Sequence, residues 1–195
     1  MINIKENEEL STLNHSCAHL LAQAVKHLYP EAKFWVGPVT TDGFYYDMDL
    51  GDNVITFEDL PKIEKEMKKI AKDGKNIIRK ELTREEALEL FKDDPYKLDL
   101  INNMENDAVI TCYTQGDFTD LCRGPHVKSC KELKYFHLLK CSGAYFKGDS
   151  KNKMLQRIYG VCYKTEEDLK EHLTMLEEAK KRDHKKLGKE LDLFM

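Results

Sequence analysis

Two short segments of this chain carry side chains that together could bind a metal or activate water. HSCAH contains His15 and His19, and DLCRGPH contains Cys122 and His126, so each pair is four residues apart. Three imidazoles and one thiolate form a reasonable tetrahedral zinc set, and a site with one fewer protein ligand would hold an activated water. The alternative is that the Gly-Pro step in the second segment turns that pair apart and leaves Cys122 as a small buried apolar residue. The chemistry depends on whether the two segments meet.

The first histidine pair lies in a segment that is predicted to be helical. Apolar residues recur at helical spacing from a cap at Ser11 to Leu28, and Tyr29-Pro30 ends the pattern. His15 and His19 fall nearly opposite this apolar stripe, among alanines. We therefore expect the pair to face away from the main core and to line a cleft.

The remaining patterns mix helices and strands without a regular alternation. We expect a hairpin at 33–50, helices at 56–73 and 83–91, strands at 76–82, 108–115, 134–146 and 154–163, and a long charged helix from 165 onward. This order predicts an α+β fold of antiparallel sheets packed with helices, followed by a long C-terminal linker helix.

Composition narrows the class of protein. The 195 residues are 41% hydrophobic and 34% charged, with a mean hydropathy of -0.60, which is typical of a globular protein. The N-terminus is too acidic for a signal peptide, so we expect a cytoplasmic protein with free thiols and no membrane contact. A net charge of -4 argues against general nucleic-acid binding but allows a local basic patch. One candidate patch surrounds a predicted turn and contains Lys147, Lys151, Lys153 and Arg157.

Five separated blocks resemble the N-terminal region of bacterial threonyl-tRNA synthetases, within the threonyl/alanyl-tRNA synthetase second additional domain family. The blocks are NHSCAHLLAQAV, GPVTTDGFYYD, DLCRGPH, GAYFKGDSKNKMLQRIYG and RDHKKLGKELDLF. The last two favour the threonyl branch over the alanyl editing proteins, which share the histidine and cysteine pairs. The resemblance implies an N-terminal lead at 1–12, an editing domain at 13–163, and a charged linker helix at 164–195 towards a class II catalytic core. The small ubiquitin-like domain that commonly precedes the editing domain is not part of this sequence.

The resemblance implies post-transfer editing, which is hydrolysis of the aminoacyl ester of mischarged seryl-tRNA(Thr). Serine lacks one methyl group of threonine, and such a difference is worth only about 1–3 kcal/mol of discrimination, so a second, hydrolytic site is needed. No ligase activity is expected from this chain alone. A freestanding or alanyl-type zinc-dependent deacylase and a non-catalytic tRNA-docking module are the alternatives.

The motifs and the resemblance also predict individual site residues. The catalytic set is His15, His19, Lys97, Asp120, Cys122 and His126, and the substrate-binding set is Tyr113, Arg123 and Gly37. We expect His15 and Lys97 to position the attacking water, Asp120 and His126 to orient polar groups of the substrate, and Cys122 to form part of the wall. Arg123 would hold a phosphate or pin its turn to a carboxylate.

The resemblance also bears on cofactors and partners. It implies that editing needs no metal, with zinc at the two histidine and cysteine pairs as the alternative. The implied partners are the acceptor end of tRNA(Thr) and the catalytic and anticodon-binding domains of the parent synthetase.

Overall fold

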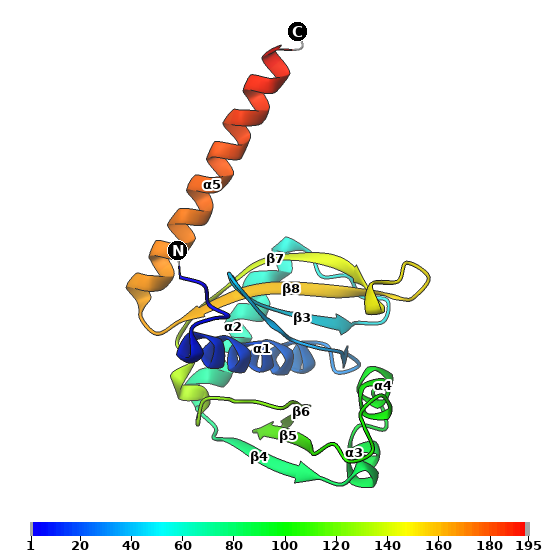
Figure 1. The fold of residues 1–195 in the computed structure, drawn as a ribbon. Coiled ribbons are helices and arrows are strands. Elements are labelled where there is room, and N and C mark those ends of the chain that lie inside the picture. The colour runs from blue at the N-terminus through cyan, green and yellow to red at the C-terminus, as the bar shows by residue number, and fades with distance from the viewer. Residues whose placement is uncertain (1, 194–195) are drawn as a thin grey trace.

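Helix α1 (Glu8–Leu28) lies between two antiparallel sheets in the computed structural model, which describes residues 2–193 and side chains through residue 183 (Figure 1). The larger sheet has the order β1-β3-β8-β7, with β2 paired to β3, and the smaller has the order β4-β5-β6. The strands are β1 (Lys33–Phe34), β2 (Val39–Thr40), β3 (Gly43–Asp49), β4 (Ile77–Leu82), β5 (Ile110–Gln115), β6 (Phe118–Leu121), β7 (Tyr135–Tyr145) and β8 (Met154–Tyr163). The predicted α+β class is confirmed.

The main core fills the space between α1, the larger sheet and α2 (Leu60–Asp73). Leu20 and Leu21 of α1, Ile63 and Met67 of α2, and Ile158 of β8 are all fully buried. Burying each such side chain contributes about 1.5–3 kcal/mol, so this apolar face anchors α1 firmly. A second, smaller cluster lies between the small sheet and the helices α3 (Arg84–Leu90) and α4 (Pro95–Asn102).

The start of α1 differs from the prediction. The helix begins at Glu8, and the Asn7 side chain caps it by accepting a hydrogen bond from the Leu10 N–H, so the predicted cap at Ser11 was wrong. Glu8 and Glu9 stabilise this earlier start because acidic side chains interact favourably with the helix N-terminus. Ile4 is fully buried in the main core, so the segment before the histidine pair contributes to the fold.

Two elements were missed. No element was predicted between the helix that ends at 91 and the strand at 108, but Asp94 and Pro95 start α4: the Asp94 carboxylate accepts from the Tyr96 and Lys97 N–H groups, and proline occupies the first turn. Strand β6 has only four residues, too few for a periodic pattern. Both elements carry residues of the site described below.

The C-terminal helix α5 (Glu166–Leu193) extends away from the rest of the molecule (Figure 1). Thr165 Oγ1 accepts from the Asp168 N–H at its start, and the Tyr163 hydroxyl lies 2.7 Å from His172 Nδ1, which ties the base of α5 to β8. The predicted long charged helix is confirmed through Leu193, and its last two predicted residues lie outside the described residues. Among residues 2–193, no helix has both the length and the apolar character needed to cross a membrane.

Candidate active site

The two predicted pairs meet. Cys122 Sγ lies 3.2 Å from His15 Nε2 and 3.2 Å from His126 Nε2, and the ring centres of His19 and His126 are 4.3 Å apart. His19 contacts Asp120 of the small sheet and is only 3% exposed, so this member of the pair is buried rather than lining a cleft as expected. His15, Cys122 and His126 remain half-buried, so a reactant can approach from their side.

The loop after β6 depends on one glycine. Gly124 has φ +77°, and a Cβ built on it would lie 2.1 Å from the Tyr113 hydroxyl oxygen. Only glycine meets both conditions. The Tyr113 ring in turn packs edge-on against His126, with ring centres 4.3 Å apart, so Tyr113 forms a wall of the site.

Ser16 fixes the tautomer of His126. Its hydroxyl donates to the Thr12 carbonyl at 2.9 Å and accepts from the Val127 N–H at 3.0 Å. Because the single hydroxyl proton is used, the contact of 3.0 Å to His126 Nδ1 requires Nδ1 to be the donor. The Nε2 lone pair of His126 therefore faces Cys122.

Asp120 is the centre of a buried polar network. Lys97 Nζ lies 2.6 Å from Asp120 Oδ1, while the Tyr46 hydroxyl at 2.5 Å and His19 Nε2 at 3.3 Å approach Oδ2. Lys97 Nζ also donates to the Trp35 carbonyl at 2.7 Å and to the Tyr46 hydroxyl at 3.0 Å. Two of the three ammonium N–H groups are therefore used in hydrogen bonds, and the ammonium also forms an ion pair with Asp120.

Burial and neighbouring charges set the protonation states. Burial lowers the pKa of His15, lowers the pKa of His19 to about 4 and holds the pKa of His126 well below its usual range. Burial also raises the pKa of Cys122 to about 11. For Asp120 burial acts upward, but Lys97 and His19 outweigh it and keep the pKa below its ordinary value. At neutral pH the site therefore has three neutral imidazoles, a protonated thiol and an ionised carboxylate.

The four pair residues are also a chemically suitable metal set. Their ligand atoms all lie within 4.8 Å of one another, and imidazole nitrogen with thiolate sulfur is a donor combination that zinc takes in proteins. The Ser16 contact to the second nitrogen of His126 is of the kind that orients metal-binding histidines. The residues present therefore fit zinc.

The two other predicted substrate-binding residues are Arg123, next to Cys122 in the loop after β6, and Gly37. Arg123 is exposed, and no ion pair to it occurs among the described side chains, so the proposed pin to a carboxylate is absent there. Gly37 lies behind Tyr46: a Cβ at this position would be 2.4 Å from the Tyr46 ring. Its absence of a side chain lets the Tyr46 ring reach Asp120.

Three of the four residues predicted as a basic patch form ion pairs with carboxylates. Lys147 pairs with Asp99 at 2.9 Å, Lys153 with Asp49 at 2.9 Å, and Arg157 with Asp47 at 2.7 Å. Each cation is therefore partly neutralised within the chain.

Sequence reasoning missed Tyr46 and Ser16. Tyr46 shares a strand with Tyr45, and strand alternation alone does not say which of the two faces inward. Ser16 sits beside His15 in the first motif, where a helical serine usually bonds back to its own turn. Its second contact, to a residue more than a hundred positions away, has no local signal.

Part of the chain matches a known protein family. Residues 110–159 match the family described as the threonyl and alanyl tRNA synthetase second additional domain. This segment is similar to that family, which bears out the resemblance predicted from the motifs.

Within that class, the relatives are threonine–tRNA ligases. The chain is 57% identical, over its whole length, to the threonine–tRNA ligase of Streptococcus equi subsp. zooepidemicus, and it covers 30% of that protein. It is 56% identical over 96% of its length to the enzyme of Enterococcus faecalis and 58% identical over 96% to that of Anoxybacillus flavithermus, covering 29% of each. The chain thus spans less than a third of the length of these relatives.

Proposed function

We propose that this chain hydrolyses the aminoacyl ester of seryl-tRNA(Thr), as the editing part of a threonine–tRNA ligase. One observation carries the proposal: neutral imidazoles from α1 and from the loop after β6 converge next to a buried, ionised Asp120. Ester hydrolysis needs a base for water and fixed polar partners for the substrate, and this arrangement supplies both.

His15 is the proposed general base. It is half-buried, its lowered pKa keeps it neutral, and it stands at the open side of the cluster. Cys122 is the proposed wall rather than a nucleophile, because a thiol with a pKa of about 11 has little thiolate at neutral pH. His126, with its Nε2 fixed as an acceptor, orients a substrate hydroxyl or ammonium.

Asp120 acts through His19 in this proposal. An ionised carboxylate only accepts hydrogen bonds, so the contact between Asp120 and His19 Nε2 makes that nitrogen the donor and leaves Nδ1 as the acceptor. We propose for Lys97 a supporting role in place of the expected contact to water, because it is only 3% exposed and its ammonium contacts Asp120, the Trp35 carbonyl and the Tyr46 hydroxyl. Lys97 instead holds the charge and orientation of Asp120.

At this site the preference between the two amino acids would be the reverse of that at the first site: the smaller serine would be accepted and the larger threonine excluded. The Tyr113 ring and the Cys122 side chain would form the wall that admits the serine side chain and excludes the additional methyl group of threonine by overlap. Exclusion of this kind adds to the limited discrimination of about 1–3 kcal/mol that one methyl group allows at the first site.

We further propose that no metal is required, as the resemblance to threonyl editing domains implies. Zinc is the alternative, because the ligand atoms of the four pair residues lie close together. If zinc binds, His15, His19, Cys122 and His126 would hold it, and it would supply an activated water.

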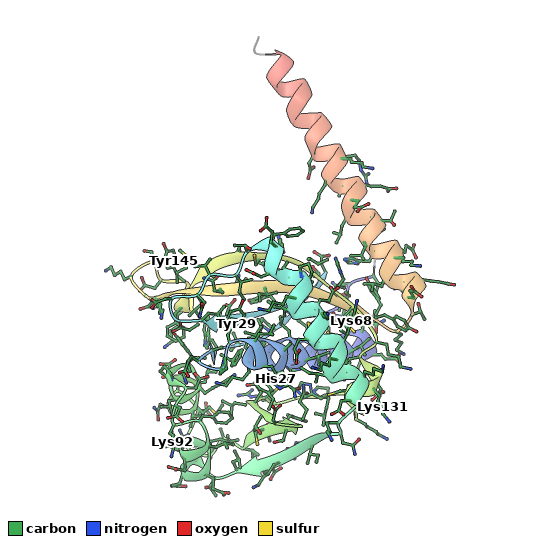
Figure 2. All side chains as sticks on the ribbon, turned by 180° about the vertical axis from the view of Figure 1, so that it is seen from behind. His27, Tyr29, Lys68, Lys92, Lys131 and Tyr145 are labelled. Atoms are coloured by element: carbon green, nitrogen blue, oxygen red, sulfur yellow. The ribbon has the colours of Figure 1, made fainter. Side chains whose placement is uncertain are left out.

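The proposed partners are the acceptor end of tRNA(Thr) and the remaining domains of the ligase, in the cytoplasm. Arg123 is free to meet a phosphate near the site. Three exposed lysines at and after the end of α2, Lys72, Lys131 and Lys134, line one groove and make no ion pair among the described side chains, so they are further candidates for phosphate contact; Figure 2 labels Lys131.

The test is release of serine from seryl-tRNA(Thr) by the wild-type chain and by His15→Ala, with and without a chelator. We expect hydrolysis that the chelator does not change and that falls at least tenfold in the variant. His137→Ala, a histidine on the far sheet, is the matched control and should keep the wild-type rate. Undiminished hydrolysis by His15→Ala would defeat the assignment, loss on chelation would favour zinc, and tRNA binding without hydrolysis would favour a docking module.

A further inference from the structure

Polar side chains occur at every fourth residue along one face of α1, and all of them meet the small sheet. After His15 and His19 come Gln23 and His27. Four helical residues advance by about 6.0 Å, and two strand residues by about 6.6 Å. Four residues of α1 therefore cover nearly the same length as two residues of β6. This match lets the contacts continue from the histidine cluster to the other end of the strand.

Gln23 binds the tip of the hairpin formed by β5 and β6. Its Nε2 donates to the Gln115 carbonyl at 3.2 Å and to Asp117 Oδ1 at 3.0 Å, while its Oε1 accepts from Gln115 Nε2 at 2.8 Å. Gln23 is 3% exposed and Gln115 is 2% exposed. Because buried amides are costly to leave unpaired, these bonds define where the tip sits against α1.

His27 bridges the same tip to a second helix. Its Nε2 lies 2.9 Å from both carboxylate oxygens of Asp117, and its Nδ1 lies 2.9 Å from Glu66 Oε1 of α2. Figure 2 shows His27 on α1 with α2 passing in front of it. Burial opposes the charge of this imidazole, but its hydrogen bonds to Asp117 and Glu66 outweigh that effect and raise the pKa of His27.

The hairpin tip is connected to the site by a short, stiff strand. The turn consists of Gly116, with φ +60°, and Asp117, and β6 begins at the next residue. Three residues after Asp117 comes Asp120, paired across the hairpin with Tyr113. A shift of the tip along α1 therefore moves Asp120 relative to His19, and Cys122 relative to His15.

We propose that Gln23 and His27 are positioning residues, which hold the hairpin tip on α1 and so set the spacing of the histidine cluster at the other end of β6. The inference rests on the proposed hydrolysis and assigns two further residues to it. Neither side chain touches the reacting groups. A displacement of about 1 Å at a catalytic site costs on the order of a hundredfold in rate, so a partial loosening is measurable.

The experiment compares Gln23→Leu and His27→Gln with wild type in seryl-tRNA(Thr) deacylation, with kcat and KM determined separately. We expect kcat to fall roughly tenfold and KM to stay within twofold, because the tRNA contacts are unchanged. His137→Gln is the matched control: it breaks a similar pair, His137 Nδ1 to Glu64 at 2.7 Å, between β7 and α2. Its kcat should stay within twofold of wild type.

A double-mutant cycle of His27→Gln with Asp117→Asn tests whether the contact itself matters. Non-additive losses in kcat are expected, because either change alone already releases the tip. Additive losses, unchanged kcat in both single variants, or an equal loss in His137→Gln would overturn the proposal.

A measurement without tRNA separates this inference from the proposed function. The imidazole NMR signals of His15 and His19 should shift in Gln23→Leu and His27→Gln but not in His137→Gln. If the wild-type chain does not hydrolyse seryl-tRNA while these shifts occur, the proposed function fails and the positioning stands. Unmoved signals in both variants would refute the positioning whatever the activity.

Discussion

Replacing Ser16 by alanine should weaken both the fold and the site. The change removes the acceptor of the Val127 N–H and the partner of His126 Nδ1, each at 3.0 Å. An unpaired, partly buried N–H costs about 1–3 kcal/mol, and an ordinary hydrogen bond is worth about 0.5–1.5 kcal/mol. The bond from Ser16 to the Thr12 carbonyl adds little, because such bonds compete with the helix itself. We expect the free energy of unfolding to fall by about 2–3 kcal/mol in total.

The same substitution should slow hydrolysis independently of stability. Without Ser16, His126 is free to take the other tautomer, in which Nε2 carries the proton and no longer accepts. Losing a preference of about 0.5–1.5 kcal/mol corresponds to a rate decrease of about two- to tenfold. The assay is single-turnover deacylation of seryl-tRNA(Thr) at 25 °C, where the variant remains folded, alongside urea unfolding.

Ser11→Ala provides the control on the same helix, because Ser11 lies one turn from the site and its side chain makes no hydrogen bond among the described residues. It should leave both stability and rate close to wild type. The reasoning would be refuted if Ser16→Ala kept the wild-type rate and the wild-type nitrogen shifts of the His126 ring.

Three further predictions concern the buried network, the loop and pH. Lys97→Met leaves the carboxylate of Asp120 buried without its cation and should lower the free energy of unfolding in urea by about 3–5 kcal/mol. A change near zero would contradict this prediction. Gly124→Ala should destabilise by more than about 1 kcal/mol and lower the deacylation rate, since its Cβ would collide with Tyr113; wild-type behaviour in both assays would contradict this. Because the pKa of His19 is about 4, far below its unfolded value, stability should decline as pH falls from 6.5 to 4. Because burial lowers the pKa of His15, the rate per folded molecule should titrate below pH 6.5, and a rate that titrates at 6.5 would count against this protonation state.

Local patterns predicted most of the architecture. The apolar stripe of α1 depends only on residues close in sequence, and so does the cap at Thr83, whose side chain accepts from the Glu86 N–H. Such features can be predicted from the sequence alone. The start of α1 was misplaced because Ser11 and Asn7 are both good caps, and the burial of Ile4 is a tertiary feature. Strand β6 was missed because four residues show no periodicity.

The residues of the site were predictable from the sequence, but their contacts with one another were not. The equal spacing of the two pairs identified His15 and Cys122 as candidates, but only the fold shows that they are 3.2 Å apart. The position of Lys97 came from the resemblance, but its hydrogen bonds depend on Trp35 and Tyr46, which lie far away in sequence. Contacts of this kind arise from the packing of α4 against β1, which no local pattern encodes.

The most direct test of the central claim is single-turnover deacylation of seryl-tRNA(Thr) and threonyl-tRNA(Thr) by this chain in excess, so that weak tRNA binding does not limit the rate. The account predicts rapid loss of serine, slow loss of threonine and no effect of a chelator. Equal rates for the two amino acids, or no release of serine at saturating protein, would contradict it.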